Sequence, residues 1–530
     1  MNSSELYSSV LVNSTNIHCN DGVPVPSHTL SSLSANGKAK RPYSGLDEYA
    51  PKRPKLSPKG EEDGSDSDDD VVVVKSRVRR QTVFGEMAAA SICRPNGVRQ
   101  NMLSSHSILR SFVSSHKSDV YRCYSTFEST DTTLPYACSY SHGAKNGGRP
   151  LIAVATEQGS LIVVNTLKRR DWDYEPQRTT YQPHNNGVFD VQWSNDDSLL
   201  TTASGDKSIR VSSVETQKSL YVLRGHSGTA KCVVWDPTHD DLLSSGGRDG
   251  SICVWDLRLN SSQNAENKTS VLSPVLVIPA AHGQDTSKGR KKKVLPLPKS
   301  VTGLIYPNSQ PHGLISSGSS DGILRFWDLR LPTAIPNGKG SNKTAKSAVA
   351  PVSLSMLDPT IMNGTRRPRG ITSLAMGAGP TAGLIFASGA DSHLHTYSLP
   401  FLMPLGSYGH PNMRISSFYV QVAVSPCGRW LASGSSDKDG SMFLFDVSNA
   451  SRTFVSPSTR SAPAWLPNGV QLQGQKGEIS AVDWAEDMIA SCADDHTVRI
   501  WRPDVEVYKK CIAEPEEQRW NWSWSTQGHA

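Results

Sequence analysis

The stretch Ser244-Ser245-Gly246-Gly247-Arg248-Asp249-Gly250-Ser251-Ile252-Cys253-Val254-Trp255-Asp256-Leu257-Arg258 decides how this 530-residue chain folds. Small residues come first, a Gly and Asp turn follows, and apolar positions then alternate up to Trp255. Period-two alternation beside turn residues is typical of antiparallel strands whose residues face the two sides of a sheet. The stretch therefore predicts two neighbouring strands joined by a tight turn at Asp249.

The same pattern recurs along the chain in seven copies. Their turn positions are Gln158, Asp206, Asp249, Asp321, Asp391, Asp439 and Asp495. Asp206 and Asp249 lie 43 residues apart, Asp391 and Asp439 lie 48 apart, and Gly-His and Trp-Asp pairs punctuate the copies. This period and punctuation are the signature of WD repeats. The chain is therefore predicted to be all-β, with a seven-bladed WD-repeat β-propeller over residues 106–504.

Several polar residues of the copies are expected to be structural. His184, His226 and His410 precede the second, third and sixth turns. In WD repeats such a His joins the turn Asp, a Ser and the Trp in one network, and each polar group would cost about 1–3 kcal/mol if it were buried unpaired. We therefore interpret these residues as blade supports and not as a catalytic triad. The second copy has Ser212 at the Trp position, which predicts the least firmly held blade.

The connections between copies carry further predictions. Residues 107–130 are expected to supply the outer strand of the closing blade, which would remove a free sheet edge. Long intervals predict basic insertions at about 260–300 and 331–369, which carry Arg290-Lys-Lys-Lys293 and Arg366-Arg-Pro-Arg369. Such loops are either solvated or contact nucleic acid through its phosphates. Residues 505–530 form a short tail whose alternating Trp residues are suited to adding a strand or docking a partner.

Residues 1–105 contain no Trp and are rich in Ser, Pro and charge. Such a segment buries too little apolar surface to offset its ordering entropy, so we predict a disordered extension. Two basic clusters precede an acidic run at 61–70 and predict nuclear import, the alternative being a solvated basic tail. The cluster residues are Lys38, Lys40, Arg41, Lys52, Arg53 and Lys55.

Composition and missing motifs exclude several classes of protein. Lys and Arg number 55 against 49 Asp and Glu, a net charge of +6 that does not by itself argue for nucleic acid. No apolar run approaches the roughly 18 residues of a membrane helix, so no membrane partner is expected. The nine cysteines form no CxxC pair and predict neither disulfides nor a zinc site. Without a phosphate-binding Gly loop, HExxH or GxSxG, we expect no enzyme, no cofactor and no metal in a nuclear protein.

Two consecutive copies end in Trp255-Asp256-Leu257-Arg258 and Trp327-Asp328-Leu329-Arg330. Both match the WDxR signature of substrate receptors of the cullin-4 ubiquitin ligase. Residues 134–502 also carry an ordered series, with PYACSYSH at 135–142, NNGVFDVQW at 185–193 and SSDGILRFWDLR at 319–330, that resembles the denticleless family. The chain lacks the Gln-x-x-aliphatic-x-x-aromatic-aromatic motif with which animal members bind the sliding clamp, which indicates a divergent or fungal-type member.

The resemblance implies a non-catalytic receptor that recruits replication and cell-cycle proteins, such as the replication licensing factor on the sliding clamp, for ubiquitylation. The implied partners are the triple-propeller adaptor, the cullin-4 complex and clamp-bound substrates that carry a degron. The residues implied in adaptor binding lie on one rim and are Trp255, Asp256, Arg258, Trp327, Asp328 and Arg330. The alternative is a WD-repeat scaffold in a chromatin or RNA-processing complex, which would not need the paired WDxR residues.

Substrate recognition is expected on the opposite rim, where one residue precedes each turn position. These residues are Glu157, Gly205, Arg248, Ser320, Ala390, Lys438 and Asp494. In the family the degron resembles a clamp-binding peptide with an added basic residue, which implies an acidic contact. Glu157 and Asp494 are the acidic candidates, because the first and last blades adjoin in a closed ring, and Arg248 is a third degron-binding candidate. The alternative is that Glu157 and Asp494 are both solvated turn residues.

Overall fold

The computed structural model describes residues 105–126, 131–170, 178–259, 262–263, 269–283, 299–330, 350–361, 367–450, 469–514 and 524–525. The chain divides into two units, 1–98 and 99–530, and every described residue belongs to the second. The predicted disordered extension, its import clusters at 38–41 and 52–55, and the basic run at 290–293 lie outside the described residues.

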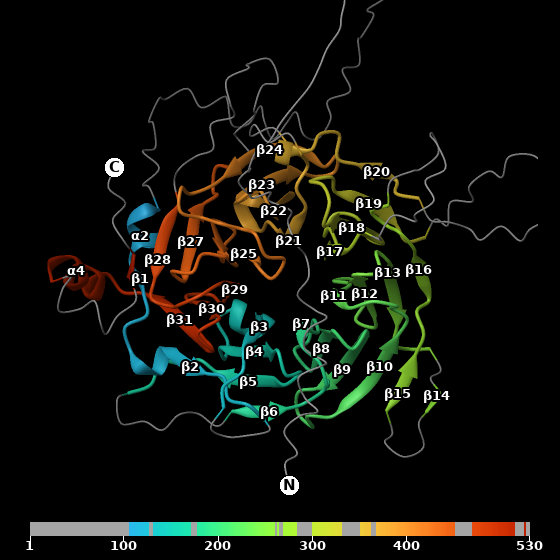
Figure 1. Ribbon diagram of the computed structural model, residues 1–530, viewed down its shortest axis with the longest axis horizontal. Coiled ribbons are helices and arrows are strands. Elements are labelled where there is room, and N and C mark those ends of the chain that lie inside the picture. The colour runs from blue at the N-terminus through green and yellow to red at the C-terminus, as the bar shows by residue number, and fades with distance from the viewer. Residues whose placement is uncertain are drawn as a thin grey trace, which may run out of the picture. The chain divides into compact units, whose positions relative to one another are not determined.

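Seven antiparallel sheets form a ring in the second unit (Figure 1), which confirms the predicted seven-bladed propeller. Blade 1 contains β3 (Pro135–Tyr140), β4 (Leu151–Thr156), β5 (Leu161–Asn165) and β6 (Thr179–Tyr181). Blade 2 contains β7 (Val188–Trp193), β8 (Leu199–Ser204), β9 (Ser208–Ser213) and β10 (Ser219–Arg224). Blade 3 contains β11 (Ala230–Trp235), β12 (Leu242–Gly247), β13 (Ile252–Asp256) and β16 (Leu276–Ile278).

The chain continues round the ring in the same strand order. Blade 4 contains β17 (Val301–Ile305), β18 (Gly313–Gly318), β19 (Arg325–Asp328) and β20 (Ser353–Leu354). Blade 5 contains β21 (Ile371–Met376), β22 (Leu384–Gly389), β23 (His393–Ser398) and β24 (Met403–Tyr408). Blade 6 contains β25 (Val422–Val424), β26 (Trp430–Ser433), β27 (Ser441–Asp446) and β28 (Val470–Gln473). Blade 7 begins with β29 (Ile479–Trp484), β30 (Ile489–Ala493) and β31 (Thr497–Pro503).

Blade 7 is completed by the N-terminal part of the propeller, as the sequence predicts. Strand β1 (Phe112–Val113) and strand β2 (Val120–Arg122) both pair antiparallel with β31. Between them, the Asp119 carboxylate accepts a hydrogen bond from Arg502 Nε at 3.1 Å, although the two residues are 383 positions apart. The first and last parts of the propeller therefore share one sheet, and β29 packs beside β3 to close the ring.

The strand order defines two rims. Because neighbouring strands are antiparallel, the connections after the second and fourth strands lie at one end of each blade, and those after the first and third lie at the other. We call the first end the turn rim, since it carries the seven repeated turns. We call the other end the WDLR rim, since Arg258 and Arg330 follow the third strands of blades 3 and 4 there.

Part of the first predicted insertion, at about 260–300, belongs to the sheets. Strand β14 (Ser262–Gln263) and strand β15 (Ser270–Leu272) extend the outer edge of blade 2, where β15 runs parallel to β10. Within the same range, β16 is the outer strand of blade 3. The second predicted insertion likewise contains β20, the outer strand of blade 4. Both strands are short, so turn spacing alone did not separate them from loops.

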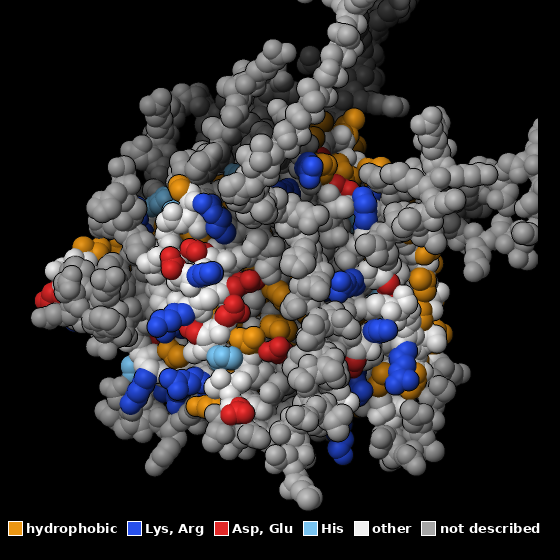
Figure 2. Space-filling view, in the orientation of Figure 1, with side chains coloured by type: hydrophobic (Ala, Val, Ile, Leu, Met, Phe, Trp, Pro, Cys, Tyr) orange, Lys and Arg blue, Asp and Glu red, His pale blue; other side chains and the backbone are white. Residues whose placement is uncertain are grey.

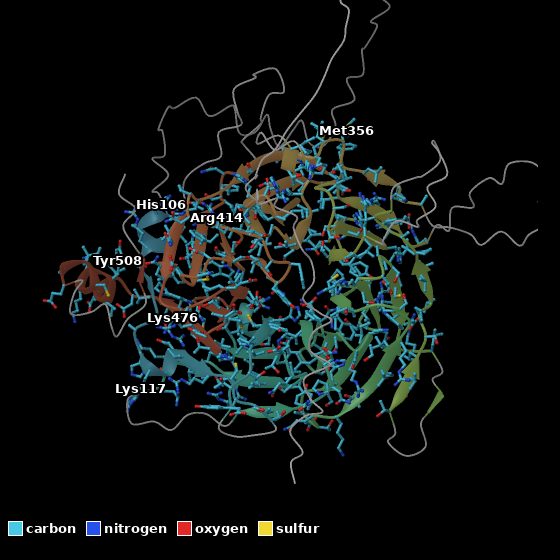
Figure 3. The ribbon with its side chains drawn as sticks, in the orientation of Figure 1. His106, Lys117, Met356, Arg414, Lys476 and Tyr508 are labelled. Carbon is cyan, nitrogen blue, oxygen red and sulfur yellow. The ribbon has the colours of Figure 1, made fainter. Side chains whose placement is uncertain are left out.

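The remaining elements lie at the edges of the ring. The helical segments are α2 (His106–Arg110), η1 (Lys117–Asp119), α3 (His142–Lys145), η2 (Pro359–Ile361), η3 (Gly379–Thr381) and α4 (Val505–Ala513). Figure 3 marks α2, η1 and α4 by His106, Lys117 and Tyr508. Strand β32 (Trp524–Ser525) of the tail pairs antiparallel with β28, so the tail adds a strand to blade 6.

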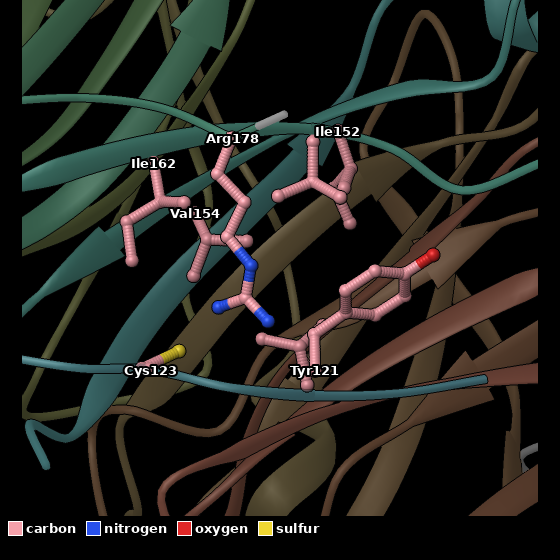
Figure 4. Close-up of a pocket in the computed structure, with 8 residues that line it drawn as sticks. Tyr121, Cys123, Ile152, Val154, Ile162 and Arg178 are labelled. Carbon is pink, nitrogen blue, oxygen red and sulfur yellow. The ribbon is translucent and has the colours of Figure 1, made fainter. Parts of the chain in front are cut away.

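The core consists of seven apolar clusters among the described residues, one between each pair of neighbouring blades. Trp255 and Trp501 are fully buried in two of them, between blades 2 and 3 and between blades 6 and 7. At the seam of blades 7 and 1, a small apolar pocket is lined by Cys123, Ile162 and Val498 (Figure 4). The Arg178 guanidinium covers this pocket and lies 5.6 Å from the centre of the Tyr121 ring. The pocket therefore belongs to the packing of the closing strand.

Candidate functional site

Blade 3 contains the complete polar network that WD repeats predict. His226 Nδ1 lies 3.2 Å from an Asp249 carboxylate oxygen, and His226 Nε2 lies 2.8 Å from Ser245 Oγ. The indole nitrogen of Trp255 donates to the same hydroxyl at 2.9 Å. Burial is the largest single influence and disfavours a charged imidazole, but the interactions with Asp249 and Cys253 together outweigh it and raise the pKa of His226 to about 9. The network holds the turn against the blade, which is a structural role.

Blade 4 has the same side chains but lacks one link. His282 Nε2 lies 2.9 Å from Ser316 Oγ, which also accepts from Trp327 Nε1 at 2.9 Å. Among the described residues, His282 Nδ1 has no hydrogen-bond partner. Burial, together with the nearby charges of Arg325 and Lys299, lowers the pKa of His282 to about 3. At neutral pH the His226 ring is therefore protonated and the His282 ring is neutral, although the two occupy equivalent positions in neighbouring blades.

Blade 2 replaces two members of the network and blade 7 replaces one. In blade 2, His184 contacts Asp206 and Thr202, both at 2.8 Å, but Ser212 stands where the Trp would be. In blade 7, Gln475 takes the place of the His, because its Oε1 accepts from Ser491 Oγ at 2.5 Å. Gln475 shows that the His position of the network accepts an uncharged amide side chain.

The expectation for His410 in blade 6 is wrong. Its Nδ1 accepts from the Asn412 backbone, and its ring lies 4.9 Å from that of Phe443. The turn of this blade is longer than the others, and Asp439 instead forms a bridge to Gly477 of the next blade. The extra length removes the carboxylate from reach of the imidazole.

The two WDxR arginines lie on the same rim in identical local structures. The Arg258 side chain is 63% exposed, and its Nε and Nη2 donate to the two Asp256 oxygens at 2.9 and 2.7 Å. The Arg330 side chain is 62% exposed, and the same atoms donate to Asp328 at 3.1 and 2.9 Å. These hydrogen bonds lower the pKa of both carboxyl groups. Each guanidinium is thus fixed in place with three of its five donors still directed elsewhere.

The tryptophans of the two motifs do not reach this rim. Trp255 is fully buried and Trp327 is 2% exposed, and both indoles are hydrogen-bonded inside their blades. Direct adaptor contact by Trp255 and Trp327 is therefore wrong, because no partner can touch a side chain held in the blade core. Their effect on the rim is indirect, since they anchor the strands that carry Asp256 and Asp328.

A histidine pair on the WDLR rim was missed by the sequence analysis. The rings of His239 and His312 are stacked with centres 5.3 Å apart and planes 29° apart, in the first connections of blades 3 and 4. His239 Nδ1 lies 3.0 Å from an Asp236 oxygen, and His312 acts electrostatically on Asp328. The stack joins the two blades that carry the Arg–Asp pairs. The only signal in the sequence was that the connections between the first and second strands of blades 3 and 4 each contain a His.

The three degron candidates lie on the turn rim, as predicted. Glu157 occupies the turn between β4 and β5, and Asp494 the turn between β30 and β31. The charges of both act on the Tyr136 hydroxyl, so the adjoining first and last blades bring them near one group. Arg248 lies apart from them, in the turn of blade 3, where its backbone N donates to Thr229 O at 2.7 Å.

An aromatic cluster next to these turns was also missed. The Tyr419 ring lies 4.9 Å from Tyr136 and 5.7 Å from Phe189, and Phe418 contacts Tyr419 at 4.2 Å between centres. Lys231 Nζ lies 3.5 Å from the centre of the Phe418 ring and 3.9 Å from that of Phe189. Figure 2 shows hydrophobic and acidic side chains gathered near the middle of the ring. These residues come from blades 1, 2 and 3 and from the connection between blades 5 and 6, so sequence spacing did not connect them.

Other kinds of site find no support in the described parts of the chain. No group of three or more His, Cys, Asp or Glu residues is arranged there to hold a metal ion. None of the helices within those parts has the length and apolar character needed to span a bilayer.

Comparison with known proteins gives a consistent picture. The model of the family "WD domain, G-beta repeat" matches residues 175–211, 217–256, 289–328, 404–446 and 468–502. "Cell division cycle protein cdt2" of Schizosaccharomyces pombe is 30% identical over 385 residues, which cover 69% of this chain and 68% of that protein. "Denticleless protein homolog" of Danio rerio is 31% identical over 378 residues, 69% of this chain and 51% of that protein.

The human "Denticleless protein homolog" is 27% identical over 431 residues, which cover 77% of this chain and 52% of that protein. The chain thus spans about half the length of the animal relatives it matches. Among solved structures, a chain of the "Crystal Structure of Mitotic Checkpoint Complex" matches with a TM-score of 0.44 and 17% identity, over 70% of this chain and 92% of that chain.

Proposed function

Because the chain belongs to the denticleless family of WD-repeat proteins, we propose that it is a non-catalytic substrate receptor of a cullin-4 RING ubiquitin ligase. In this proposal the WDLR rim binds the triple-propeller adaptor, and the turn rim holds the substrate. The substrates are replication and cell-cycle proteins, such as the licensing factor on the sliding clamp. The site of action is the nucleus.

The observation that carries the proposal is the pair of matched Arg–Asp groups on neighbouring blades. A guanidinium that is already held by a carboxylate loses little conformational freedom when it binds a partner. Its remaining donors can bind carboxylates or backbone carbonyls in a fixed geometry, which a lysine cannot reproduce. Two such groups in equivalent positions of blades 3 and 4 form a repeated contact surface.

The test is the double variant Arg258→Ala with Arg330→Ala. Interface arginines often cost about 2 kcal/mol or more when truncated. Two such losses would weaken adaptor binding by roughly a thousandfold, so the adaptor should no longer co-purify. Because both side chains are exposed, the midpoint of thermal unfolding should stay unchanged. The Arg258→Lys with Arg330→Lys variant keeps both charges and should still bind less adaptor than the unaltered chain.

Arg429→Ala is the matched control, because Arg429 is an exposed arginine in the first connection of blade 6, on the same rim. That variant should retain the adaptor. Full adaptor recovery with the double alanine variant would show that these arginines are not the contact. Loss of the adaptor with the Arg429 control would place the contact elsewhere on the rim.

A further inference from the structure

Two connections on the WDLR rim touch each other through stacked histidine rings. The connection between β11 and β12 of blade 3 carries His239, and the connection between β17 and β18 of blade 4 carries His312. Their ring centres are 5.3 Å apart, and the His239 side chain is 40% exposed. Packing between these blades is supplied by a separate buried cluster around Trp327. The stack at the surface therefore needs an explanation other than blade packing.

Each connection is hydrogen-bonded to the WDLR segment of its own blade. In blade 3, Leu257 N donates to Asp241 O at 3.0 Å. In blade 4, Leu329 N donates to His312 O at 3.0 Å. Leu257 and Leu329 directly precede the two exposed arginines in the sequence. A displacement of either connection therefore moves the backbone of the arginine beside it.

The Arg–Asp groups also lie close to the connections through their side chains. Arg258 Nε lies 4.0 Å from an Asp241 oxygen. The hydrogen bonds from Arg330 lower the pKa of Asp328 most, and the nearby His312 ring adds to this effect. Among the described residues, no hydrogen bond or ion pair joins the two Arg–Asp groups directly. At the surface of the rim, the histidine stack therefore connects them.

Both stacked rings are held in place. His239 Nδ1 lies 3.0 Å from an Asp236 oxygen, which fixes the ring within its own turn. The connection of blade 4 begins at Tyr306, whose hydroxyl is hydrogen-bonded to Ser244 of blade 3 at 2.5 Å. Within the described parts of the chain the His312 ring makes no hydrogen bond, so its orientation depends on stacking against His239.

A fixed spacing between two contact groups strengthens binding to one partner. Once the first group is bound, binding of the second is intramolecular, and its strength depends on how stiffly the two are joined. A stiff link also reduces the conformational freedom that is lost on binding. Arg258 and Arg330 meet both conditions, since a carboxylate holds each guanidinium and the connections behind them are joined.

We infer that the stack of His239 and His312 joins Arg258 and Arg330 into one bivalent binding unit for the adaptor. This inference rests on the proposed function, because it takes the adaptor to be the partner of these arginines. The histidines are positioning residues, which set the separation of the arginines and do not themselves pair with the partner. The partner then offers two hydrogen-bond acceptors, carboxylates or backbone carbonyls, at the matching separation.

The first experiment measures the affinity of the full chain for the purified adaptor by biolayer interferometry. His239→Ala with His312→Ala should weaken binding about tenfold although both arginines remain, because the second contact loses effective concentration. His239→Phe with His312→Phe keeps two stacked rings without their nitrogen atoms, and should bind within about twofold of the unaltered chain. Circular dichroism checks the fold of every variant. If the paired alanine variant does not fold, His312→Ala alone replaces it, because one change also removes the stack.

His142→Ala is the matched control. His142 lies in α3, in the first connection of blade 1, and its side chain is 49% exposed. Its Nδ1 lies 3.0 Å from an Asp197 oxygen of blade 2, so it also joins two neighbouring connections of this rim. Neither of those blades carries a WDxR motif. The control variant should therefore keep the full adaptor affinity.

A double-mutant cycle tests the coupling itself. Arg258→Ala and Arg330→Ala are measured singly and together, with the stack intact and with both histidines replaced by Ala. In a bivalent unit either single change removes the advantage of the second contact, so the product of the two single losses exceeds the loss in the double variant. That excess factor should fall about tenfold when the stack is removed.

Hydrogen exchange gives a readout that does not need the adaptor. The Leu257 and Leu329 amides donate to the two connections, so they report whether the connections are held. Mass spectrometry of the free chain should show faster exchange of both amides in the paired alanine variant. Exchange should remain unchanged in the paired phenylalanine variant and in the His142 control.

Unchanged adaptor affinity in the paired alanine variant would overturn the inference, and so would an excess factor that does not depend on the stack. Weak binding by the paired phenylalanine variant would show that the imidazole nitrogens contact the adaptor, which contradicts a positioning role. An equal loss with His142→Ala would indicate general loosening of the rim and would also overturn the coupling. An unaltered chain that does not bind the adaptor would refute the proposed function, and hydrogen exchange would then decide whether the stack joins the two connections.

Discussion

At the scale of single residues, the charge of a buried histidine depends on one neighbouring carboxylate. His226 reaches Asp249 and carries a pKa of about 9, whereas His282 has no such partner and carries a pKa of about 3. Unfolded histidine has a pKa of about 6.5. The same side chain in two adjacent blades therefore links folding to protons with opposite signs.

We expect His226→Gln and His282→Gln to change the pH dependence of stability in different ranges. Folded His226 binds its proton more tightly than the unfolded chain does, so its contribution is complete below pH 6.5 and is lost as pH rises toward 9. Folded His282 resists protonation, so its contribution is complete above pH 6.5 and is lost as pH falls toward 3. Each Gln variant should remove the slope in its own range only, measured as the free energy of unfolding in urea from pH 4 to 9.

Gln475 of blade 7 makes Gln the appropriate substitute, because it already bonds a blade Ser at the equivalent position. If the two variants showed the same dependence of unfolding free energy on pH, a charged His226 beside a neutral His282 would be contradicted. A variant whose far-ultraviolet circular dichroism differs from that of the unaltered chain at pH 7 would be replaced by the Asn version.

At the scale of elements, the closing strands support the fold through a few buried contacts. Strand β1 has only two residues, yet Phe112 is 1% exposed and meets Trp484 and Trp430 edge to face at 5.7 and 6.2 Å. Edge-to-face aromatic pairs contribute beyond the area they bury. The short strand therefore acts as an anchor between blades 6 and 7.

Phe112→Ala should lower the free energy of unfolding by about 3–5 kcal/mol, because it leaves a cavity against two indoles. Ile108→Ala is the control, since Ile108 is 46% exposed on the neighbouring helix α2 and should change stability by no more than about 0.5 kcal/mol. Urea unfolding followed by tryptophan fluorescence gives both values. A loss in the Phe112 variant no larger than in the control would show that the seam does not depend on this ring.

At the scale of the whole molecule, the sequence predicts the repeated parts and misses what joins them. The turn spacing predicts seven blades and the closing strand at 107–130, since each blade repeats the same alternation and turn. It does not predict β14 and β15, because their partner in blade 2 lies about 50 residues earlier and each strand is only two or three residues long. Tyr136 of blade 1 and Lys231 of blade 3 both lie against Tyr419 of the connection between blades 5 and 6, which no periodicity within one copy records. Arg258 and Arg330 were found because a motif marks them, whereas no motif marks the stacked His239 and His312 on the same rim.

Nuclear import is a prediction for the whole chain. Replacing the basic residues of both clusters with Ala should move a fluorescently tagged chain to the cytoplasm, because importin recognition requires those charges. The residues to replace are Lys38, Lys40, Arg41, Lys52, Arg53 and Lys55. Fluorescence microscopy measures the nuclear fraction, and replacement of the basic run at 290–293 serves as the control. A nuclear fraction unchanged in the cluster variant would refute the signal.

The pairing of β1 and β2 with β31 has a consequence for synthesis on the ribosome. Asp119 and Arg502 lie 383 residues apart in the sequence. At a synthesis rate of about 5–20 residues per second, Arg502 therefore emerges from the ribosome roughly 20–80 s after Asp119. During that time β1 and β2 have no partner strand, and the face of blade 1 that packs against blade 7 in the finished ring stays uncovered. We therefore expect the yield of the native chain to depend on translation speed and on chaperone access in this interval.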